Sequence, residues 1–186
     1  SEQIRSCADR LLGEDVDNLD GELESRKGTR SLFRGPRPNL QGFTKSEEQM
    51  NYLRERITAL LQSRQPEEIA IFAGTNQQVK SLRDQLKEFN IPNGDLGRDS
   101  RGIQVGTLHK AKGLEFKVTF VVDVSDRQFP LRSALDRMDP GDQDDFVDEQ
   151  RRLLYVGMTR ARDELSVTWV GKPSRYLAPL LEEALT

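Results

Sequence analysis

Two segments carry the residue types that phosphate chemistry needs. The first follows the apolar run 103–107 and reads Thr-Leu-His-Lys-Ala-Lys-Gly-Leu-Glu-Phe from residue 107 to residue 116. Hydroxyl, imidazole and ammonium donors in so short a span can hold phosphate oxygens, and Gly113 lets a ligand approach the backbone. A carboxylate among these cations would repel phosphate, so Glu115 is better suited to accept from a ribose hydroxyl. The same pattern is compatible with a turn that only carries solvated lysines.

The second segment, residues 149–162, reads Glu-Gln-Arg-Arg-Leu-Leu-Tyr-Val-Gly-Met-Thr-Arg-Ala-Arg. At about 100° per residue, Arg160 lies at the border of the apolar arc of a helix, close to the direction of Leu153. Its stem could pack while its guanidinium reaches across an interface. An arginine in that position can stabilise the charge on a transferring phosphoryl group. The alternative is an ordinary solvated basic helix.

The elements around these segments alternate between strand and helix. Apolar runs predict strands at 69–73, 103–107, 118–123 and 165–170, and helical spacing of apolar residues predicts helices between them. The run 69–73 has no polar alternation, as expected for a strand covered on both faces. This order predicts an α/β domain with a mainly parallel sheet flanked by helices.

Local signals place the helix starts and the loops. Thr75 followed by Gln78 predicts a capping box, and before the helix near residue 50 either Thr44 with Glu47 or Ser46 with Gln49 could form one. We expect residues 14–43, on the N-terminal side of the domain, to form a surface loop and short extended segments around 31–33 and 39–43. The seven acidic residues from 136 to 149 predict a solvated loop that runs into a helix.

Composition excludes several classes of protein. The chain has 186 residues, 28 Lys plus Arg, 31 Asp plus Glu, a net charge of −3 and a single cysteine. One cysteine cannot form an intramolecular disulfide, and no apolar run approaches the length of a membrane span. A pI near 5.4 means that any nucleic-acid binding must be local. His109 is the only histidine, so we expect no metal site; the first residues lack an apolar secretory core, so we expect a piece of a cytoplasmic protein.

Taken together, the two segments resemble a known family. The pattern T-x-H-x-A-K-G-L-E-F followed by R-R-L-L-Y-V-G-M-T-R-A resembles motifs V and VI of the UvrD/Rep-like helicases of superfamily 1. Residues 69–92 look like motif IVa of that family, and residues 172–177, Lys-Pro-Ser-Arg-Tyr-Leu, are similar to its closing P-S-R-F-L. Residues 1–5 look like the stretch just after its motif IV. The resemblance therefore spans nearly the whole chain.

The resemblance implies that residues 1–186 form the C-terminal RecA-like domain, 2A, of an ATP-dependent DNA helicase or translocase, with three α/β/α layers. Arg160 would be the catalytic arginine that reaches the γ-phosphate of ATP. Glu115 would contact the ribose, with Gly113 close to the nucleotide. The residues expected to hold single-stranded DNA are Thr75, Asn76, Thr107, His109 and Lys112.

Departures from the family pattern limit what this chain can do alone. It contains no G-x-x-x-x-G-K-[ST] phosphate loop, so the first RecA-like domain is missing, and the short interval between residues 76 and 105 leaves no room for a 2B domain. ATP with Mg²⁺ would be bound mainly by that missing N-terminal domain, the expected partner, and this fragment alone should be inactive. Gly74 stands where relatives commonly have Arg.

Two alternatives remain open at this stage. The chain could be a noncatalytic RecA-like module that binds single-stranded DNA or a protein. It could also be the helicase part of a fused repair nuclease. The presence of both Glu115 and Arg160 speaks against the first alternative, since a pure binding module does not need a γ-phosphate arginine.

Overall fold

The computed structural model describes residues 1–12, 35–97 and 101–183. The predicted loop at 14–27 and the extended segment at 31–33 lie outside these residues. The helices are α1 (Glu2–Leu12), α2 (Ser46–Leu60), α3 (Asn76–Glu88), α4 (Arg132–Leu135), α5 (Gln143–Thr159) and α6 (Ala178–Glu183), with short 3-10 helices η3 (Pro66–Glu68), η4 (Leu108–Ala111) and η5 (Arg175–Leu177). The strands are β1 (Asn39–Phe43), β2 (Ile69–Ala73), β3 (Asn93–Asp95), β4 (Ile103–Thr107), β5 (Phe116–Val121) and β6 (Ala161–Val170).

The strands form one sheet in the order β1-β6-β5-β2-β4-β3, and each neighbouring pair is parallel. All carboxyl ends therefore meet at one edge of the sheet, called here the carboxyl edge, and all amino ends meet at the opposite amino edge. In the pairing of β2 with β4, Ala73 lies opposite Thr107. The segments that follow these two strands consequently start side by side.

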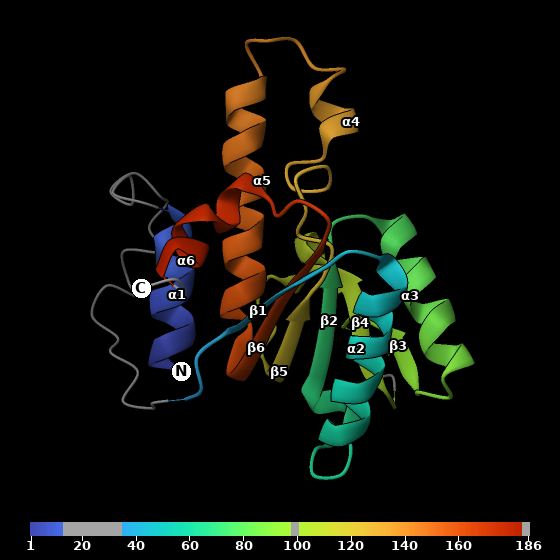
Figure 1. Ribbon diagram of the computed structural model, residues 1–186. Coiled ribbons are helices and arrows are strands. Elements are labelled where there is room, and N and C mark those ends of the chain that lie inside the picture. The colour runs from blue at the N-terminus through green and yellow to red at the C-terminus, as the bar shows by residue number, and fades with distance from the viewer. Residues whose placement is uncertain (13–34, 98–100, 184–186) are drawn as a thin grey trace.

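Helices cover both faces of the sheet (Figure 1). Ile69 and Ile71 of β2 pack into a core with α2 and α3, whereas Ala70 and Phe72 pack into a second core with α1, α5 and α6. All five residues of β2 are fully buried, which explains why the strand lacks polar alternation. The predicted three-layer α/β/α, RecA-like sheet is confirmed.

The connection from β4 to β5 is short and runs the length of the strands, from the carboxyl edge back to the amino edge. β4 ends at Thr107 on the carboxyl edge, and β5 begins at Phe116 on the amino edge. The segment 108–115, called here the crossover, therefore carries the first sequence motif from one edge to the other. α5 holds it in place, because Gly157 lies directly against Leu108: a Cβ added to Gly157 would meet Leu108 Cδ2 at 2.0 Å.

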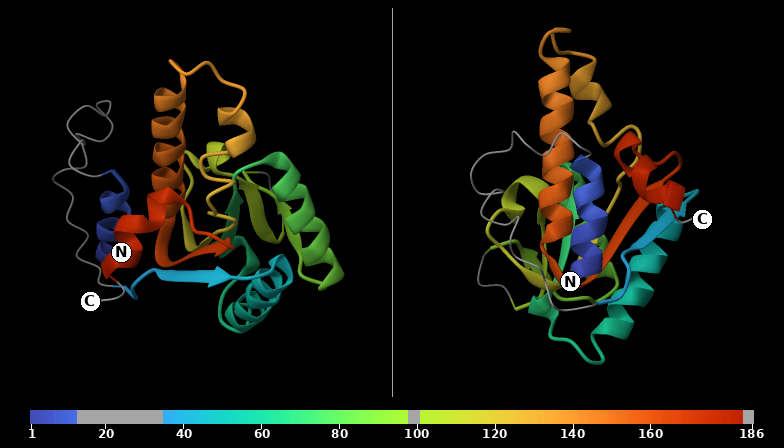
Figure 2. Two further views of the ribbon diagram at one scale, coloured as in Figure 1. Left: turned by 45° about the horizontal axis from the view of Figure 1, so that its top comes forward. Right: turned by 90° about the vertical axis from the view of Figure 1, so that its left-hand side faces the viewer.

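The first half of α5 projects beyond the sheet beside α4 and the connection between them (Figures 1 and 2). Most of the acidic residues from 136 to 149 are exposed there, as the sequence predicts for this region. The second half of α5 packs beside α1, as the right-hand view of Figure 2 shows.

The start of α2 differs from both predicted capping boxes. Glu48 Oε2 accepts from the backbone N–H groups of Thr44 (2.9 Å) and Lys45 (3.1 Å). Glu48 is therefore the capping partner, and not Glu47 or Gln49. Gln49 instead turns inward and is only 3% exposed. The Thr75 and Gln78 box is confirmed: Thr75 Oγ1 accepts from Gln78 N at 3.2 Å, and Gln78 Oε1 accepts from Thr75 N at 3.0 Å.

Candidate functional site

Two of the residues expected to contact the nucleotide have charged side chains, and both lie at the amino edge. Glu115 and Arg160, 45 positions apart in the sequence, both line a cleft of about 190 Å³ where β5 and β6 begin. The other lining residues are Ser1, Ile4, Arg5, Tyr155, Thr159, Ala161 and Arg162. Tertiary structure has thus brought the ends of the two motifs into one site, called here the nucleotide cleft.

Arg160 is held rigidly in this cleft. It follows the last residue of α5 and is only 8% exposed. Its Nε donates to Val156 O at 3.0 Å, Nη1 to Leu114 O at 3.3 Å, and Nη2 to Thr159 Oγ1 at 3.3 Å. These acceptors offset part of the cost of burying a guanidinium. They also fix the position of its charge and join the end of α5 to the crossover.

Glu115 and Gly113 occupy different surroundings. Glu115 is exposed and available to a ligand at the mouth of the cleft, whereas Gly113 is not one of the lining residues. Gly113 has φ +79°, and a Cβ there would meet nothing within 4 Å. Its glycine is therefore explained by the left-handed backbone conformation. Proximity of Gly113 to a nucleotide stays a prediction.

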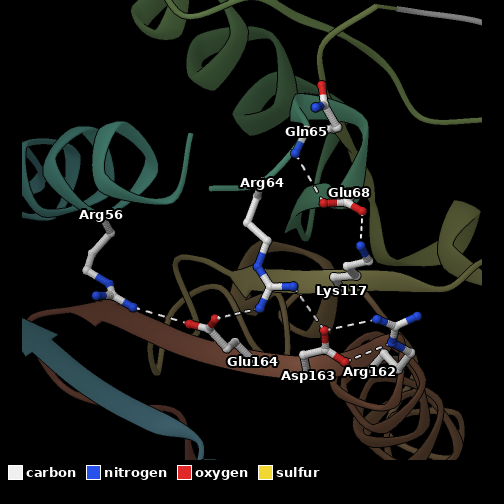
Figure 3. A network of polar contacts seen from close by, with 8 residues as sticks. All are labelled: Arg56, Arg64, Gln65, Glu68, Lys117, Arg162, Asp163 and Glu164. Atoms are coloured by element: carbon white, nitrogen blue, oxygen red, sulfur yellow. Dashed lines mark hydrogen bonds and ion pairs between the residues drawn. The ribbon is translucent and has the colours of Figure 1, made fainter. Parts of the chain in front are cut away.

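A network of charged side chains borders the nucleotide cleft (Figure 3). Arg64 contacts Asp163 at 3.1 Å and Glu164 at 3.3 Å, and Arg162 donates to Asp163 from Nε at 2.8 Å. Lys117 forms a further ion pair with Glu68. The network, called here the amino-edge ion pairs, neutralises the polar start of β6. The predicted strand at 165–170 is therefore too short: β6 begins at Ala161, which pairs with Phe116 of β5.

These contacts shift the titration of the carboxyl groups. Hydrogen bonds from Arg162 are the main cause that lowers the pKa of Asp163, with Arg64 adding to the effect. The hydrogen bond from Lys117 likewise lowers the pKa of Glu68. Both groups are therefore more stable in their charged form than an isolated carboxyl.

The expected DNA contacts lie elsewhere, toward the carboxyl edge. Thr75 and Asn76 follow β2, and Thr107 and His109 follow the neighbouring β4. Asn76 and Thr107 line a common groove of about 370 Å³ between α3 and the strands β3 and β4. Asn76, His109 and Lys112 are exposed, whereas Thr107 is only 6% exposed. Lys112 lies further along the crossover, toward the amino edge.

A hydrogen-bond network supports this edge. Asp123, at φ +58° after β5, accepts from Gln49 Nε2 at 2.8 Å and from Gln78 Nε2 at 3.4 Å. Gln49 Oε1 in turn accepts from Thr168 Oγ1 at 2.8 Å. Because Gln78 also caps the turn at Thr75, the network joins α2, β6 and α3 through one carboxylate. The hydroxyl of Thr75 is itself engaged in this cap, so a direct DNA contact from it stays a prediction.

Several lining residues are not among the site residues expected from the sequence. Arg5, Tyr155 and Thr159 line the nucleotide cleft, and Lys80 and Lys110 line the groove. Helical spacing contains a signal for Lys80, which lies one turn after Asn76 on the same face of α3. For Arg5 there is no local signal, because only the packing of α1 against α5 brings it to the cleft.

Gly74, the departure from motif IVa, has a packing explanation. A Cβ at this position would meet Phe129 Cε2 at 2.9 Å, and Phe129 is fully buried. A larger side chain such as Arg would have to displace that ring. No DNA contact from the side of residue 74 is therefore expected.

No group of three or more His, Cys, Asp or Glu side chains converges within residues 1–12, 35–97 and 101–183. In the same part of the chain, no helix has the length and apolar character required to cross a bilayer.

Comparisons with known proteins agree with the fold and the family expected from the sequence. Residues 94–172 match the model of the UvrD-like helicase C-terminal domain. DNA helicase II of Escherichia coli (strain K12) is 31% identical over 154 residues, which cover 76% of this chain and 20% of that protein. ATP-dependent DNA helicase UvrD2 of Mycobacterium tuberculosis (strain ATCC 25618 / H37Rv) is 40% identical over 87 residues, which cover 41% of this chain and 12% of that protein. The chain thus spans a fifth or less of the length of these relatives.

A solved structure shares the fold. The crystal structure of the C-terminal domain of a possible DNA helicase from Lactobacillus plantarum WCFS1 superposes with a TM-score of 0.70 and 20% sequence identity, covering 96% of this chain and 91% of that one. At that identity the likeness supports the fold alone. The family match and the helicase relatives carry the further conclusion, which confirms the resemblance found in the sequence: this chain carries a UvrD-like helicase C-terminal domain.

Proposed function

We propose that this chain is the C-terminal motor domain of an ATP-dependent DNA helicase or translocase. Arg160 supplies a positive charge to the γ-phosphate of ATP, Glu115 contacts the ribose, and the carboxyl edge grips single-stranded DNA. The observation that carries this proposal is the position of Glu115 and Arg160 in one cleft. A domain that only binds DNA has no use for a buried arginine beside an exposed carboxylate.

The nucleotide cleft suits one wall of a shared site. Its volume of about 190 Å³ is smaller than the ~300–1,000 Å³ typical of sites that enclose a small molecule. ATP would therefore be held mainly by an N-terminal RecA-like domain. Mg²⁺, when bound with ATP, neutralises phosphate charge. Among the described residues that line the cleft only Glu115 is acidic, so we assign no magnesium ligand to this chain.

The DNA side of the proposal rests on the carboxyl edge. Asn76 and Thr107 line one groove, and the exposed His109 and Lys112 follow on the crossover. Such neutral and positive donors suit the phosphates and sugars of a strand whatever its bases. Because the crossover also carries Glu115, closure of two domains around ATP would shift these grips relative to those of the other domain. Repeated closure and reopening would move the strand.

The test is the DNA-stimulated ATPase activity of the full-length protein with Arg160→Ala. We expect turnover to fall by about 10³ to 10⁵, which corresponds to about 4 to 7 kcal/mol of activation free energy, while ATP binding is largely kept. Arg152→Ala is the matched control, because Arg152 is exposed on the same helix and does not line the cleft.

Folding must be checked separately, because Arg160→Ala leaves the carbonyls of Val156 and Leu114 without this donor. Arg160→Lys keeps a positive charge, and denaturant unfolding of each variant shows whether the fold is intact. Equal turnover in folded Arg160→Ala and the wild type would contradict the catalytic role. That result would favour the noncatalytic binding module.

A further inference from the structure

The groove beside α3 continues past the expected DNA contacts. It is lined by a row of side chains on one face of α3 together with residues of β3, β4 and η4. Asn76, Lys80, Arg83 and Lys87 follow at intervals of four, three and four residues, which places them along one side of the helix. At a rise of 1.5 Å per residue this row extends for about 16 Å. Figure 1 shows α3 running beside β3 and β4 over this length.

The charges in this groove are only partly balanced. Arg83 forms an ion pair with Asp95, and Lys87 lies 3.8 Å from Asp84. Lys80 and Lys110 are both exposed, and within the described part of the chain no acidic side chain forms an ion pair with either. Lys80 stands on α3 and Lys110 on η4, so two different elements each contribute an exposed lysine to the lining of the groove.

The lining also indicates which part of a nucleic acid the groove suits. Its apolar residues are the aliphatic Val79, Leu96 and Val105, and no aromatic side chain is among the described lining residues. Stacking of bases needs aromatic platforms. Ammonium and amide donors instead suit phosphate and sugar oxygens, which carry no sequence information.

We propose that this groove, called here the α3 groove, binds the sugar-phosphate backbone of single-stranded DNA as the strand leaves Asn76 and Thr107, with Lys80 and Lys110 each contacting a phosphate. The inference rests on the proposed function and extends it, because neither lysine is among the residues that the sequence analysis expects to hold DNA. It implies that the strand follows α3 along the β3 side of the sheet, and that binding there is independent of base sequence.

The experiment compares Lys80→Ala, Lys110→Ala and the double variant of the 186-residue chain in binding to a fluorescent oligothymidylate over a range of salt concentrations. Each lost phosphate contact should reduce the slope of log affinity against log salt by about 0.7. The affinity of each single variant relative to the wild type should therefore be about fivefold lower at 0.1 M salt than at 1 M salt. The double variant should lose about twice the slope, because the two lysines contact separate phosphates.

Arg56→Ala is the matched control. It also removes one exposed positive charge, but Arg56 pairs with Glu164 at the amino edge (Figure 3). Its slope should equal that of the wild type. Thermal unfolding of all variants should be nearly unchanged, since the three side chains are exposed.

Lys112→Ala separates failure of this inference from failure of the proposed function. If Lys112→Ala reduces the slope while both α3-groove variants behave like Arg56→Ala, the strand does not use the groove and only the inference is overturned. If the wild-type chain shows no salt-dependent binding at all, both proposals fail. A loss that differs between oligothymidylate and oligoadenylate would show base contacts and contradict backbone binding.

A second measurement observes the lysines directly. Acetylation of the chain with and without bound oligothymidylate, followed by mass spectrometry, should show protection of Lys80 and Lys110. Lys172, which is 79% exposed on the loop after β6, serves as the internal reference. Equal modification of Lys80 and Lys110 in both states would overturn the inference.

Discussion

Two networks of polar side chains lie at opposite edges of the sheet: ion pairs around Asp163 at the amino edge, and hydrogen bonds among amides, hydroxyls and one carboxylate around Asp123 at the carboxyl edge. At the first edge, Arg64 and Arg162 both form ion pairs with Asp163. At the second edge, Asp123 accepts hydrogen bonds from the side-chain amides of two glutamines. The first arrangement places a buried arginine beside a cleft. The second leaves exposed donors along an open groove.

The difference corresponds to the chemistry proposed for each edge. Stabilising charge on a phosphoryl group requires a cation at a fixed position, and Arg160 is fixed by three hydrogen bonds. Holding a strand that must slide requires contacts that are weak and salt-dependent, and the exposed His109 and Lys112 fit that need. The crossover connects the two edges within eight residues, so neither can move far without the other.

The largest expected effect on stability is at the contact that joins the two edges. Gly157→Ala places a Cβ 2.0 Å from Leu108 Cδ2, and relief of that overlap should lower the free energy of unfolding by about 1 to 3 kcal/mol. Urea unfolding measures this. Gly141→Ala is the control, because a Cβ there meets nothing within 4 Å. Additivity of Gly157→Ala with Leu108→Val in a double-mutant cycle would show that the two positions are not coupled.

A smaller effect is expected at the carboxyl edge. Asp123→Ala should lower the free energy of unfolding by about 1 to 2 kcal/mol, because it removes two hydrogen bonds and places an alanine at φ +58°. Asp123→Gly removes the same bonds but suits that conformation, so it should cost less. Thermal unfolding of the two variants decides this. If Asp123→Gly were the less stable of the pair, backbone strain would not be part of the effect.

An effect of similar size is expected on the affinity for ATP when the nucleotide cleft is altered. Glu115→Gln replaces a charged acceptor by a neutral one, which should weaken ATP binding to the full-length protein by about fivefold, or about 1 kcal/mol, with little change in turnover. Isothermal titration with ATP and with a 3′-deoxy analogue measures it. The wild type should prefer ATP, and the variant should lose that preference. An unchanged preference would remove the ribose assignment.

The smallest effect is expected from the amino-edge ion pairs. Since hydrogen bonds from Arg162 hold the pKa of Asp163 below its ordinary value in the folded protein, the carboxylate stabilises the fold at neutral pH. This contribution is lost as the pH falls through the lowered value. Asp163→Asn should therefore reduce stability at neutral pH by less than about 1 kcal/mol and flatten its decline in acid. Urea unfolding at a series of pH values checks this; an equally steep acid decline in the variant would assign the effect to other groups.

Local patterns in the sequence sufficed for many features. The buried run 69–73, the capping box of Thr75 with Gln78 and the helical spacing around α3 were predicted correctly, because each depends on neighbouring residues and on hydrophobic periodicity. The resemblance in the two motif segments identified the family. The same local reasoning failed for the start of α2, because Gln49 contacts Asp123 and Thr168, which lie far away in the chain.

The sequence by itself determined the elements, the family and the residue types suited to phosphate chemistry. Only the tertiary structure separated Thr107 from Glu115 to opposite edges of the sheet, although one short segment contains both. The physical reason is that β4 and β5 each pair parallel to β2, so the chain between them must cross the sheet. That pairing also brings Leu114 O to Arg160 and Lys110 to the α3 groove, and no local pattern encodes such distant contacts.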